Sequence, residues 1–275
     1  MKEILSFAIL AIMLQGCIEK TKTNLELIKE IDSLKEKRII YEFQVDSTGA
    51  LIDTLSIEKS KINKNQVIVF KEKIINKEHL KSTNYYRDNG DLFYSKNESS
   101  ELGILSTSEF WKKNNEISKG LYLGYRDNKI KDTININYEY FYNDNGLKKK
   151  TIVTSKFKDE DEIGNTTELF YSNGEKLTSE ISIEYGDTLK VNKYIYTKNL
   201  IKKKTIKDYK NGVFVNLDYN EKGYIISKKV FLQQMDSLLE VSETQFITDE
   251  KGQIIKSIQT QLPSNNKIYI EFKYN

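Results

Sequence analysis

Cys17 is the only cysteine of the 275-residue chain, and its neighbours define its chemistry more clearly than those of any other residue. A charged start, residues 1–3, precedes eleven mostly apolar residues, 4–14, and Gly16 stands directly before the thiol. This apolar run is too short to cross a bilayer as a helix and has the length of a signal-peptide hydrophobic region. Because one thiol cannot form an internal disulfide, the fold must be stabilised by packing alone.

The segment Leu14-Gln15-Gly16-Cys17 resembles the lipobox of bacterial lipoproteins, with a large aliphatic residue at minus three and a small one at minus one. The resemblance implies cleavage between Gly16 and Cys17 and attachment of diacylglycerol to the thiol. It divides the start of the chain into a signal peptide, residues 1–16, and a lipidated tether with a short helix, residues 17–38. The alternatives are a plain secretory signal with a chance cysteine and a buried amino-terminal helix.

A lipid anchor places the mature protein in the bacterial cell envelope, with the membrane as its first partner. One acyl chain holds only marginally, so the multiple acylation that the resemblance implies would make the attachment durable. Ile18, rather than Asp, follows the cysteine, which in the family's sorting rule favours the outer membrane. Whether the protein faces the periplasm or the cell surface stays open.

Outside this segment the sequence offers little chemistry. His79 is the only histidine, and one histidine cannot form a two-histidine metal site. The acidic run 159–162 lacks the alternating spacing of calcium loops, so a solvated loop is the simpler interpretation. We therefore expect no catalytic residues, no metal and no cofactor. The enzymatic alternative is a glycan hydrolase that uses two carboxylates.

Composition favours a β-rich envelope protein without nucleic-acid contacts. The 43 basic and 40 acidic residues are interspersed and give a net charge of +3, which leaves no basic footprint for nucleic acid. The 18 tyrosines and 12 phenylalanines, with frequent Ile, Val and Thr, suit pleated and half-buried strands. The chain length after the leader suits one large or two modest domains.

One segment, Asn24 to Arg38, has a helical pattern. Apolar residues recur there at helical spacing with Lys and Glu between them, at Leu27, Ile28, Ile31 and Leu34. We interpret it as a surface helix lying on the domain. The alternative is a spacer that lifts the domain off the membrane.

From residue 39 onward the apolar period changes to two, which predicts strands. An apolar face alternates with a polar one in three plain cases, at residues 134–142, 213–219 and 268–274. Such alternation is typical of an antiparallel sheet with one covered face. We therefore predict an all-β fold, an antiparallel meander of β-hairpins in an elongated or curled sheet.

A turn recurs along the second half of the chain. An aromatic or apolar strand end is followed by polar residues and then by a residue that tolerates positive φ. Successive positions differ by 28, 25, 24 and 29 residues, the length of two strands with two turns, and weaker copies end at Gly49 and Gly90. The series consists of Gly146, Gly174, Asn199, Gly223 and Gly252.

Two stretches carry a family resemblance. Residues 170–177 are similar to the MORN-variant repeats of some bacterial antitoxin-like lipoproteins, and residues 218–226 to the YD repeats of Rhs-type envelope proteins. The resemblance implies stacked β-hairpin repeats over residues 131–275 and no shared catalytic set. Residues 39–130 are expected to form a more irregular amino-terminal part of the same sheet. The Gly-x-Trp of the MORN variant is missing.

Basic and aromatic residues recur in phase with these turns. Two lysine triplets follow turns at nearly equivalent positions, and a stacked sheet would align them into a stripe for acidic glycans, lipopolysaccharide phosphates or an acidic partner. The simpler interpretation is that they protect strand edges. We interpret Tyr138, Tyr140 and Tyr142 as core, because they share a phase with the apolar residues before them. The triplets are Lys148, Lys149 and Lys150, and Lys202, Lys203 and Lys204.

The function that the sequence favours is a lipid-anchored envelope protein whose repeat sheet presents a binding surface without catalysis. Its partner would be an envelope protein or glycan. The alternative is an immunity or antitoxin-like protein that neutralises a toxin in the envelope, which the MORN-variant resemblance implies.

Overall fold

The computed structural model describes residues 22–75, 79–127, 129–157, 163–172, 176–235 and 237–274. Three sequence predictions lie outside the described residues: the signal peptide with Gly16 and Cys17, the acidic run 159–162, and the turn residue Gly174.

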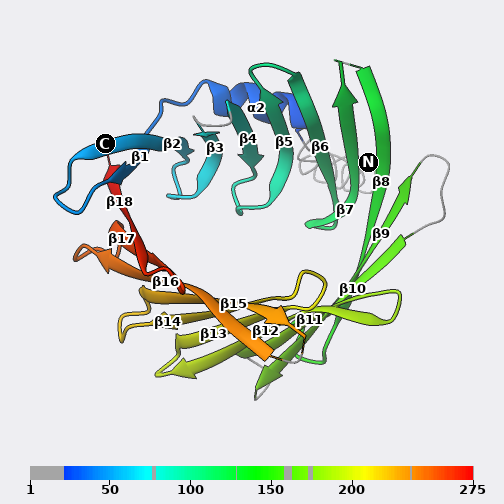
Figure 1. Ribbon diagram of the computed structural model, residues 1–275. Coiled ribbons are helices and arrows are strands. Elements are labelled where there is room, and N and C mark those ends of the chain that lie inside the picture. The colour runs from blue at the N-terminus through cyan, green and yellow to red at the C-terminus, as the bar shows by residue number, and fades with distance from the viewer. Residues whose placement is uncertain are drawn as a thin grey trace, which may run out of the picture.

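The described residues form one helix, α2 (Asn24–Asp32), and a single antiparallel sheet of eighteen strands that closes into a barrel (Figure 1). The strands are β1 (Arg38–Val45), β2 (Leu51–Ile62), β3 (Ile68–Ile75), β4 (Leu80–Tyr86), β5 (Leu92–Ser99), β6 (Gly103–Lys113), β7 (Glu116–Arg126), β8 (Lys129–Tyr142), β9 (Lys148–Phe157), β10 (Ile163–Ser172), β11 (Lys176–Glu184), β12 (Asp187–Thr197), β13 (Leu200–Asp208), β14 (Val213–Tyr219), β15 (Ile225–Gln234), β16 (Ser237–Thr248), β17 (Ile254–Gln261) and β18 (Asn266–Tyr274).

The predicted all-β antiparallel meander is confirmed, but the expected open sheet is wrong. Every strand pairs with its neighbours in the chain, and β1 pairs with both β2 and β18. The closing ladder runs from Ile40 opposite Tyr274 to Val45 opposite Tyr269. Closure gives the first and last strands the hydrogen bonds that an open sheet would leave free at its edges.

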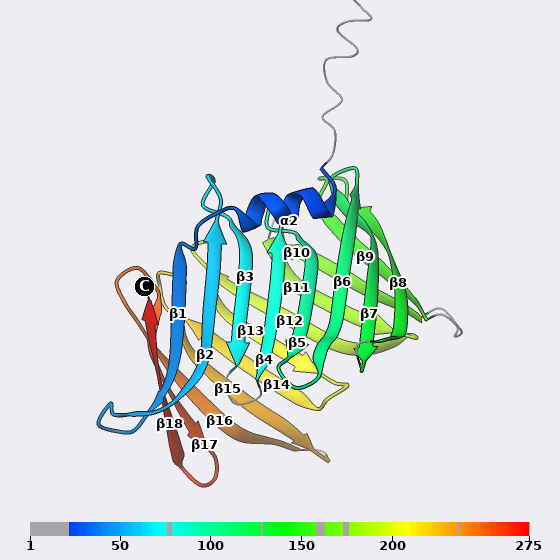
Figure 2. The ribbon, with the colours of Figure 1, turned by 90° about the horizontal axis from the view of Figure 1, so that it is seen from above.

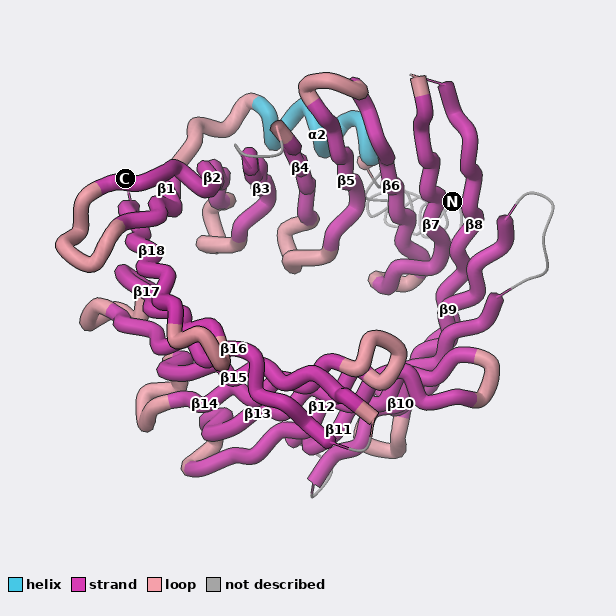
Figure 3. Tube along the Cα trace, viewed as in Figure 1, coloured by secondary structure: helices cyan, strands magenta, loops and turns pink. Residues whose placement is uncertain are grey.

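Successive hairpins turn at alternate ends of the barrel (Figures 2 and 3). We call the end where α2 lies the helix rim and the other end the far rim. The turns that follow even-numbered strands lie at the helix rim, and those that follow odd-numbered strands at the far rim. The sequence repeat of 24 to 29 residues is therefore one complete passage down the barrel wall and back.

Six of the described turns share one geometry. The first residue donates its backbone N–H to the carbonyl four residues later and accepts the N–H three residues later. Where the first residue is Asn or Asp, its Oδ1 also accepts two backbone N–H groups, which fixes the turn. The fourth residue has positive φ, and at Gly252 a side chain would in addition collide with the ring of Tyr224. The first residues are Asp46, Asn63, Arg87, Asn143, Asn220 and Asp249.

Each of these six hairpins also carries one extra residue on its second strand, six positions after the turn begins. A bulge of this kind breaks the strict alternation of faces, so that adjacent residues such as Val69 and Phe70 pack in one cluster. The bulge residues are Ile52, Val69, Phe93, Lys149, Ile226 and Ile255.

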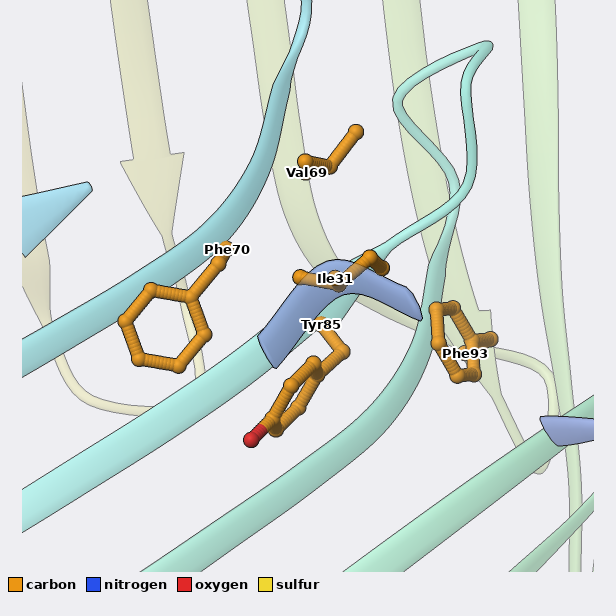
Figure 4. Close-up of a cluster of buried hydrophobic side chains, with 5 residues drawn as sticks. All are labelled: Ile31, Val69, Phe70, Tyr85 and Phe93. Carbon is orange, nitrogen blue, oxygen red and sulfur yellow. The ribbon is translucent and has the colours of Figure 1, made fainter. Parts of the chain in front are cut away.

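Helix α2 covers two of these bulges and forms the buried core of the described residues with them (Figure 4). Val69 and Phe93 are 2% and 0% exposed beneath it, with Ile31, Phe70 and Tyr85 in the same cluster. The equivalent apolar bulge residues elsewhere, Ile52, Ile226 and Ile255, remain 58%, 40% and 40% exposed. The hairpin repeat therefore places an apolar residue at most bulge positions, and only the bulge residues beneath α2 become buried.

The prediction of a surface helix is confirmed, although it ends earlier than expected. Thr23 and Glu26 form a capping box at its start. Ser33 ends it, because its N–H and hydroxyl both donate to carbonyls of the last turn. Leu34 still packs against the cluster from the connection to β1. No helix among the described residues combines the length and the apolar character needed to span a bilayer.

We predict that Phe93→Ala lowers the free energy of unfolding by about 3–5 kcal/mol, because a fully buried ring would leave a cavity under α2. Ile255→Ala is the matched control, since it truncates the same hairpin position where no helix covers it. Its expected cost is below about 1 kcal/mol. Urea unfolding of both variants measures the difference, and equal losses would show that α2 does not protect this position.

Candidate functional site

The inner and outer faces of the barrel wall follow from the position of α2. Figures 1 and 2 place the helix outside the ring, and the Tyr85 hydroxyl donates to Asp32 Oδ1 on it, so Tyr85 points outward. Paired residues share a face, and the ladder from Tyr85 leads across β5, β6 and β7 to Asn135 on β8. Asn135 is therefore on the outer face, and the residues that alternate with it point inward.

The apolar rows predicted from the sequence all line the inner face. The strand ladders place the rows on β14 and β18 on the inner face as well. Successive strand pairs connect Asn165, on β10, to Ile268, on β18, and paired residues share a face. None of their members is buried, and most keep partial solvent exposure. The interpretation of Tyr138, Tyr140 and Tyr142 as core is therefore wrong, because no second layer packs on this face among the described residues. The rows are Ile134, Ile136, Tyr138, Tyr140 and Tyr142; Val213, Val215, Leu217 and Tyr219; and Ile268, Ile270, Phe272 and Tyr274.

The opposite arc of the inner face is polar. The central inward positions of β2 to β6 carry mainly serine, asparagine and lysine side chains, whereas Ile75, Leu80 and Phe110 point inward near the strand ends. Small side chains dominate here, and Ser56, Ser60 and Ser106 are buried between longer neighbours. The inner face thus combines apolar rows on β8, β14 and β18 with a group of hydroxyl- and amide-bearing positions on β2 to β6. Polar residues such as Thr244 and Gln259 also point inward on the strands between the apolar rows. The polar positions on β2 to β6 are Ser56, Ser60, Lys71, Lys73, Ser82, Asn84, Ser95, Asn97, Ser106 and Ser108.

One group of polar side chains between the apolar rows is joined by hydrogen bonds. Glu180 Oε2 accepts hydrogen bonds from Asn192 Nδ2 at 3.1 Å and from the Tyr194 hydroxyl at 3.3 Å. Lys204 Nζ lies 5.1 Å from the centre of the Tyr194 ring. Burial, and then the charge of Glu180, raise the pKa of Tyr194 to about 12, so the hydroxyl stays protonated and able to donate. Asn192 Oδ1 is buried without a partner and is free to accept a hydrogen bond.

A pocket of about 440 Å³ lies where the barrel closes, and we call it the seam pocket. Its two carboxylates already have partners: Glu42 accepts from Ser56 at 2.7 Å and lies 3.7 Å from Lys73, and Glu58 pairs with Lys71 at 2.9 Å. Arg38 pairs with none of the described carboxylates, and its guanidinium stacks 5.1 Å from the centre of the Tyr274 ring. The lining residues are Arg38, Ile40, Glu42, Ser56, Glu58, Lys73, Lys251, Gly252, Gln253, Ile254, Phe272 and Tyr274.

The predicted lysine stripe is divided by the fold. The two triplets lie on β9 and β13 at the helix rim, with three strands between them, so they form no continuous stripe. Within each triplet the faces differ: Lys150 lies 3.8 Å from Glu168 on the outer face, whereas Lys204 points inward over Tyr194. Lys149 and Lys202, the bulge residues, are exposed at the rim.

The predicted repeat turns that the structure describes all lie at the helix rim. Gly146, Gly223 and Gly252 have φ of 73°, 82° and 82°, and Asn199 has φ of 70° in a two-residue turn with Lys198. His79 lies in the far-rim turn after β3, where its carbonyl accepts the N–H of Ser100. The turn series therefore marks one end of the barrel.

Tyrosine hydroxyls connect successive repeats at this rim. Tyr171 donates to the Lys148 carbonyl at 2.8 Å, Tyr196 to that of Leu177 at 2.9 Å, and Tyr274 to that of Ile254 at 2.6 Å. Each acceptor precedes the bulge of the preceding hairpin, so the three bonds are equivalent. At Tyr171 and Tyr196 the aromatic residue of the sequence repeat thus joins one hairpin to the next, and Tyr274 makes the same bond on the last strand.

Sequence reasoning did not find the seam pocket or the Glu180 group. Both combine residues from strands whose pairing is set by the register, and the seam joins residues from the two ends of the chain. The shared phase of Asn192 and Tyr194 was a readable signal, but nothing in the sequence identified Glu180 as their partner.

Comparisons with known proteins give only distant likenesses. No protein-family model and no curated protein matches the chain. The solved structure titled "Crystal Structure of TcdB2-TccC3" is 10% identical with a TM-score of 0.36, covering 83% of this chain and 14% of that one. A porin-like protein from Bacteroides uniformis is 10% identical with a TM-score of 0.37, covering 87% and 96%. At these TM-scores neither likeness bears on function.

We predict that Tyr196→Phe lowers the free energy of unfolding by about 0.5–1.5 kcal/mol, because it removes one hydrogen bond between repeats and keeps the ring. Tyr185→Phe is the matched control, since Tyr185 is 73% exposed in a far-rim turn. Chemical denaturation should place the control within about 0.5 kcal/mol of the parent chain. Indistinguishable midpoints for all three chains would contradict a stabilising role for the connection.

Proposed function

We propose that this protein is a lipid-anchored binding protein of the bacterial envelope, and that the inner face of its barrel holds an amphiphilic ligand. The observation that carries the proposal is the set of apolar rows on β8, β14 and β18, which face inward and remain uncovered among the described residues. Covering such surface is worth about 25 cal/mol per Å², so a ligand with an apolar part gains free energy there.

The polar features of the same face favour an amphiphile over a purely apolar ligand. Glu180, Asn192 and Lys204 lie between the apolar rows of β8 and β14, and β2 to β6 present hydroxyl and amide groups. Pockets that bind small molecules typically combine apolar walls with a few polar groups that orient the ligand. A molecule with a hydrocarbon part and a polar head can contact the apolar rows and the polar side chains at once.

The proposed anchor brings the barrel close to such ligands. The helix begins at the helix rim, where Asn24 bonds the Phe110 carbonyl and Arg87. Thr23 lies six positions after Cys17, so the rim can lie at most about 20 Å from an acylated Cys17. Membrane amphiphiles would therefore meet the barrel at this end, where Lys149 and Lys202 are exposed.

We predict that Cys17→Ala moves the protein from the membrane fraction to the soluble fraction, because the acyl chains that hold it are lost. Thr23→Ala, which changes the nearby helix cap only, should leave the fractionation unchanged. Fractionation with immunoblotting, and the intact mass of the parent protein, measure the outcome. A membrane-bound Cys17→Ala protein together with an unacylated parent would refute the anchor.

Binding to the inner face is tested by photo-crosslinking in cells. Benzoylphenylalanine placed at Leu217 points inward, and at the adjacent Asn216 it points outward, so the two positions form a matched pair. We expect an adduct of lipid mass at position 217 and none at 216. The absence of an adduct at 217, or the same adduct at both positions, would contradict the proposal. A protein adduct at 217 alone would instead favour the immunity-type function.

A further inference from the structure

We propose that the seam pocket binds an anionic oxygen group of the phosphate type, the head group of the amphiphile on the inner face. This inference rests on the proposed function for the apolar part of the ligand. The anion site itself stands on separate observations of charge, burial and pocket shape.

The charge balance of the seam pocket leaves its cations unpaired. Glu42 is occupied by Lys73 and Ser56, and Glu58 by Lys71. Arg38 and Lys251 line the same pocket without an ion pair among the described residues. An anion entering the pocket would therefore meet two cations that form no salt bridge with a described carboxylate, one of which, Arg38, already donates a hydrogen bond to the Tyr274 hydroxyl.

Two buried polar atoms beside the pocket also lack partners. Arg38 Nε and Ser60 Oγ are buried without a hydrogen bond, and the two residues are paired across β1 and β2. Ser60 is 1% exposed, so water does not readily satisfy its hydroxyl. Of the two residues, Arg38 lines the pocket, and a guanidinium offers planar donors that match phosphate oxygens. A buried donor without a partner is costly, and an anion that reached Arg38 Nε would remove that cost.

The position of the pocket connects it to the apolar row of β18. Phe272 and Tyr274 line the pocket, and the same row continues along β18 through Ile270 to Ile268. At about 3.4 Å per residue, the four positions from Phe272 to Ile268 give roughly 14 Å of apolar surface leading away from the pocket. A head group held by Arg38 would therefore place its hydrocarbon part along β18.

The test uses the full chain in zwitterionic lipid nanodiscs and isothermal titration calorimetry with three probes, with empty nanodiscs as the blank. Hexyl phosphate carries chain and anion, hexyl glucoside carries the chain with a neutral head, and inorganic phosphate carries the anion alone. We expect hexyl phosphate to bind at least tenfold more tightly than hexyl glucoside.

Arg38→Gln and Lys251→Gln should each lose most of this preference while their affinity for hexyl glucoside stays unchanged. Lys251 lies exposed in a turn, so its variant tests the site even if Arg38→Gln disturbs closure. Lys59→Gln is the charge-matched control, because Lys59 lies on the outer face of β2 next to the same ladder. It should retain the preference.

Each outcome separates the two proposals. Equal binding of hexyl phosphate and hexyl glucoside, or a preference that survives both variants, would overturn the anion site and leave amphiphile binding standing. Arg38-dependent binding of inorganic phosphate, without binding of either hexyl compound, would support the anion site and refute the proposed function. Equal affinities for inorganic phosphate and hexyl phosphate, both dependent on Arg38, would identify a free anion as the source of the bound group.

Discussion

The pairing of β1 with β18 is the interaction on which the rest of the structure depends. An antiparallel meander of this length has two free edges, and exposed edges pair with other chains. Here β1 lies between β2 and β18, so both ends of the sheet are satisfied within one chain. Closure turns one face of every strand inward. The side chains on that face of the alternating strands therefore line the interior of the barrel. It also creates the seam pocket, whose lining comes from both ends of the chain.

The repeat unit explains how so many strands stay in register. A one-residue slip would move the apolar row of a strand to the other face. The Asn or Asp side chain at five of the described turns fixes the start of the hairpin by accepting two backbone N–H groups. The tyrosine hydroxyls of Tyr171, Tyr196 and Tyr274 then fix one hairpin against the next. Local turn chemistry and a longer-range hydrogen bond therefore specify the same alignment.

Much of the local structure could be predicted from the sequence, because local rules decide it. The alternation at residues 134–142, the turn glycines and the helix pattern each depend on neighbouring residues, and the structure confirms these elements. Closure could not be predicted in this way, since β1 and β18 are separated by nearly the whole chain. The sequence also could not tell Phe93 from Ile255, which occupy the same repeat position, because only the placement of α2 distinguishes them. The prediction that Tyr138, Tyr140 and Tyr142 belong to the core was wrong for the same reason. Periodicity shows that one face of a strand is apolar, but it does not show what covers that face.

An uncovered apolar interior has an energetic consequence that connects the fold to the proposed function. In most domains the apolar face of a sheet is buried against a second layer, and that burial is the main source of stability. Here α2 provides such a layer over β3 to β5 only, where Val69 and Phe93 are almost completely buried. Elsewhere stability must come mainly from the continuous ladder, the turn hydrogen bonds and contacts between neighbouring side chains on each face. Burial of the apolar rows of β8, β14 and β18 against another molecule would therefore be favourable, and this supports the binding function that we propose for the inner face.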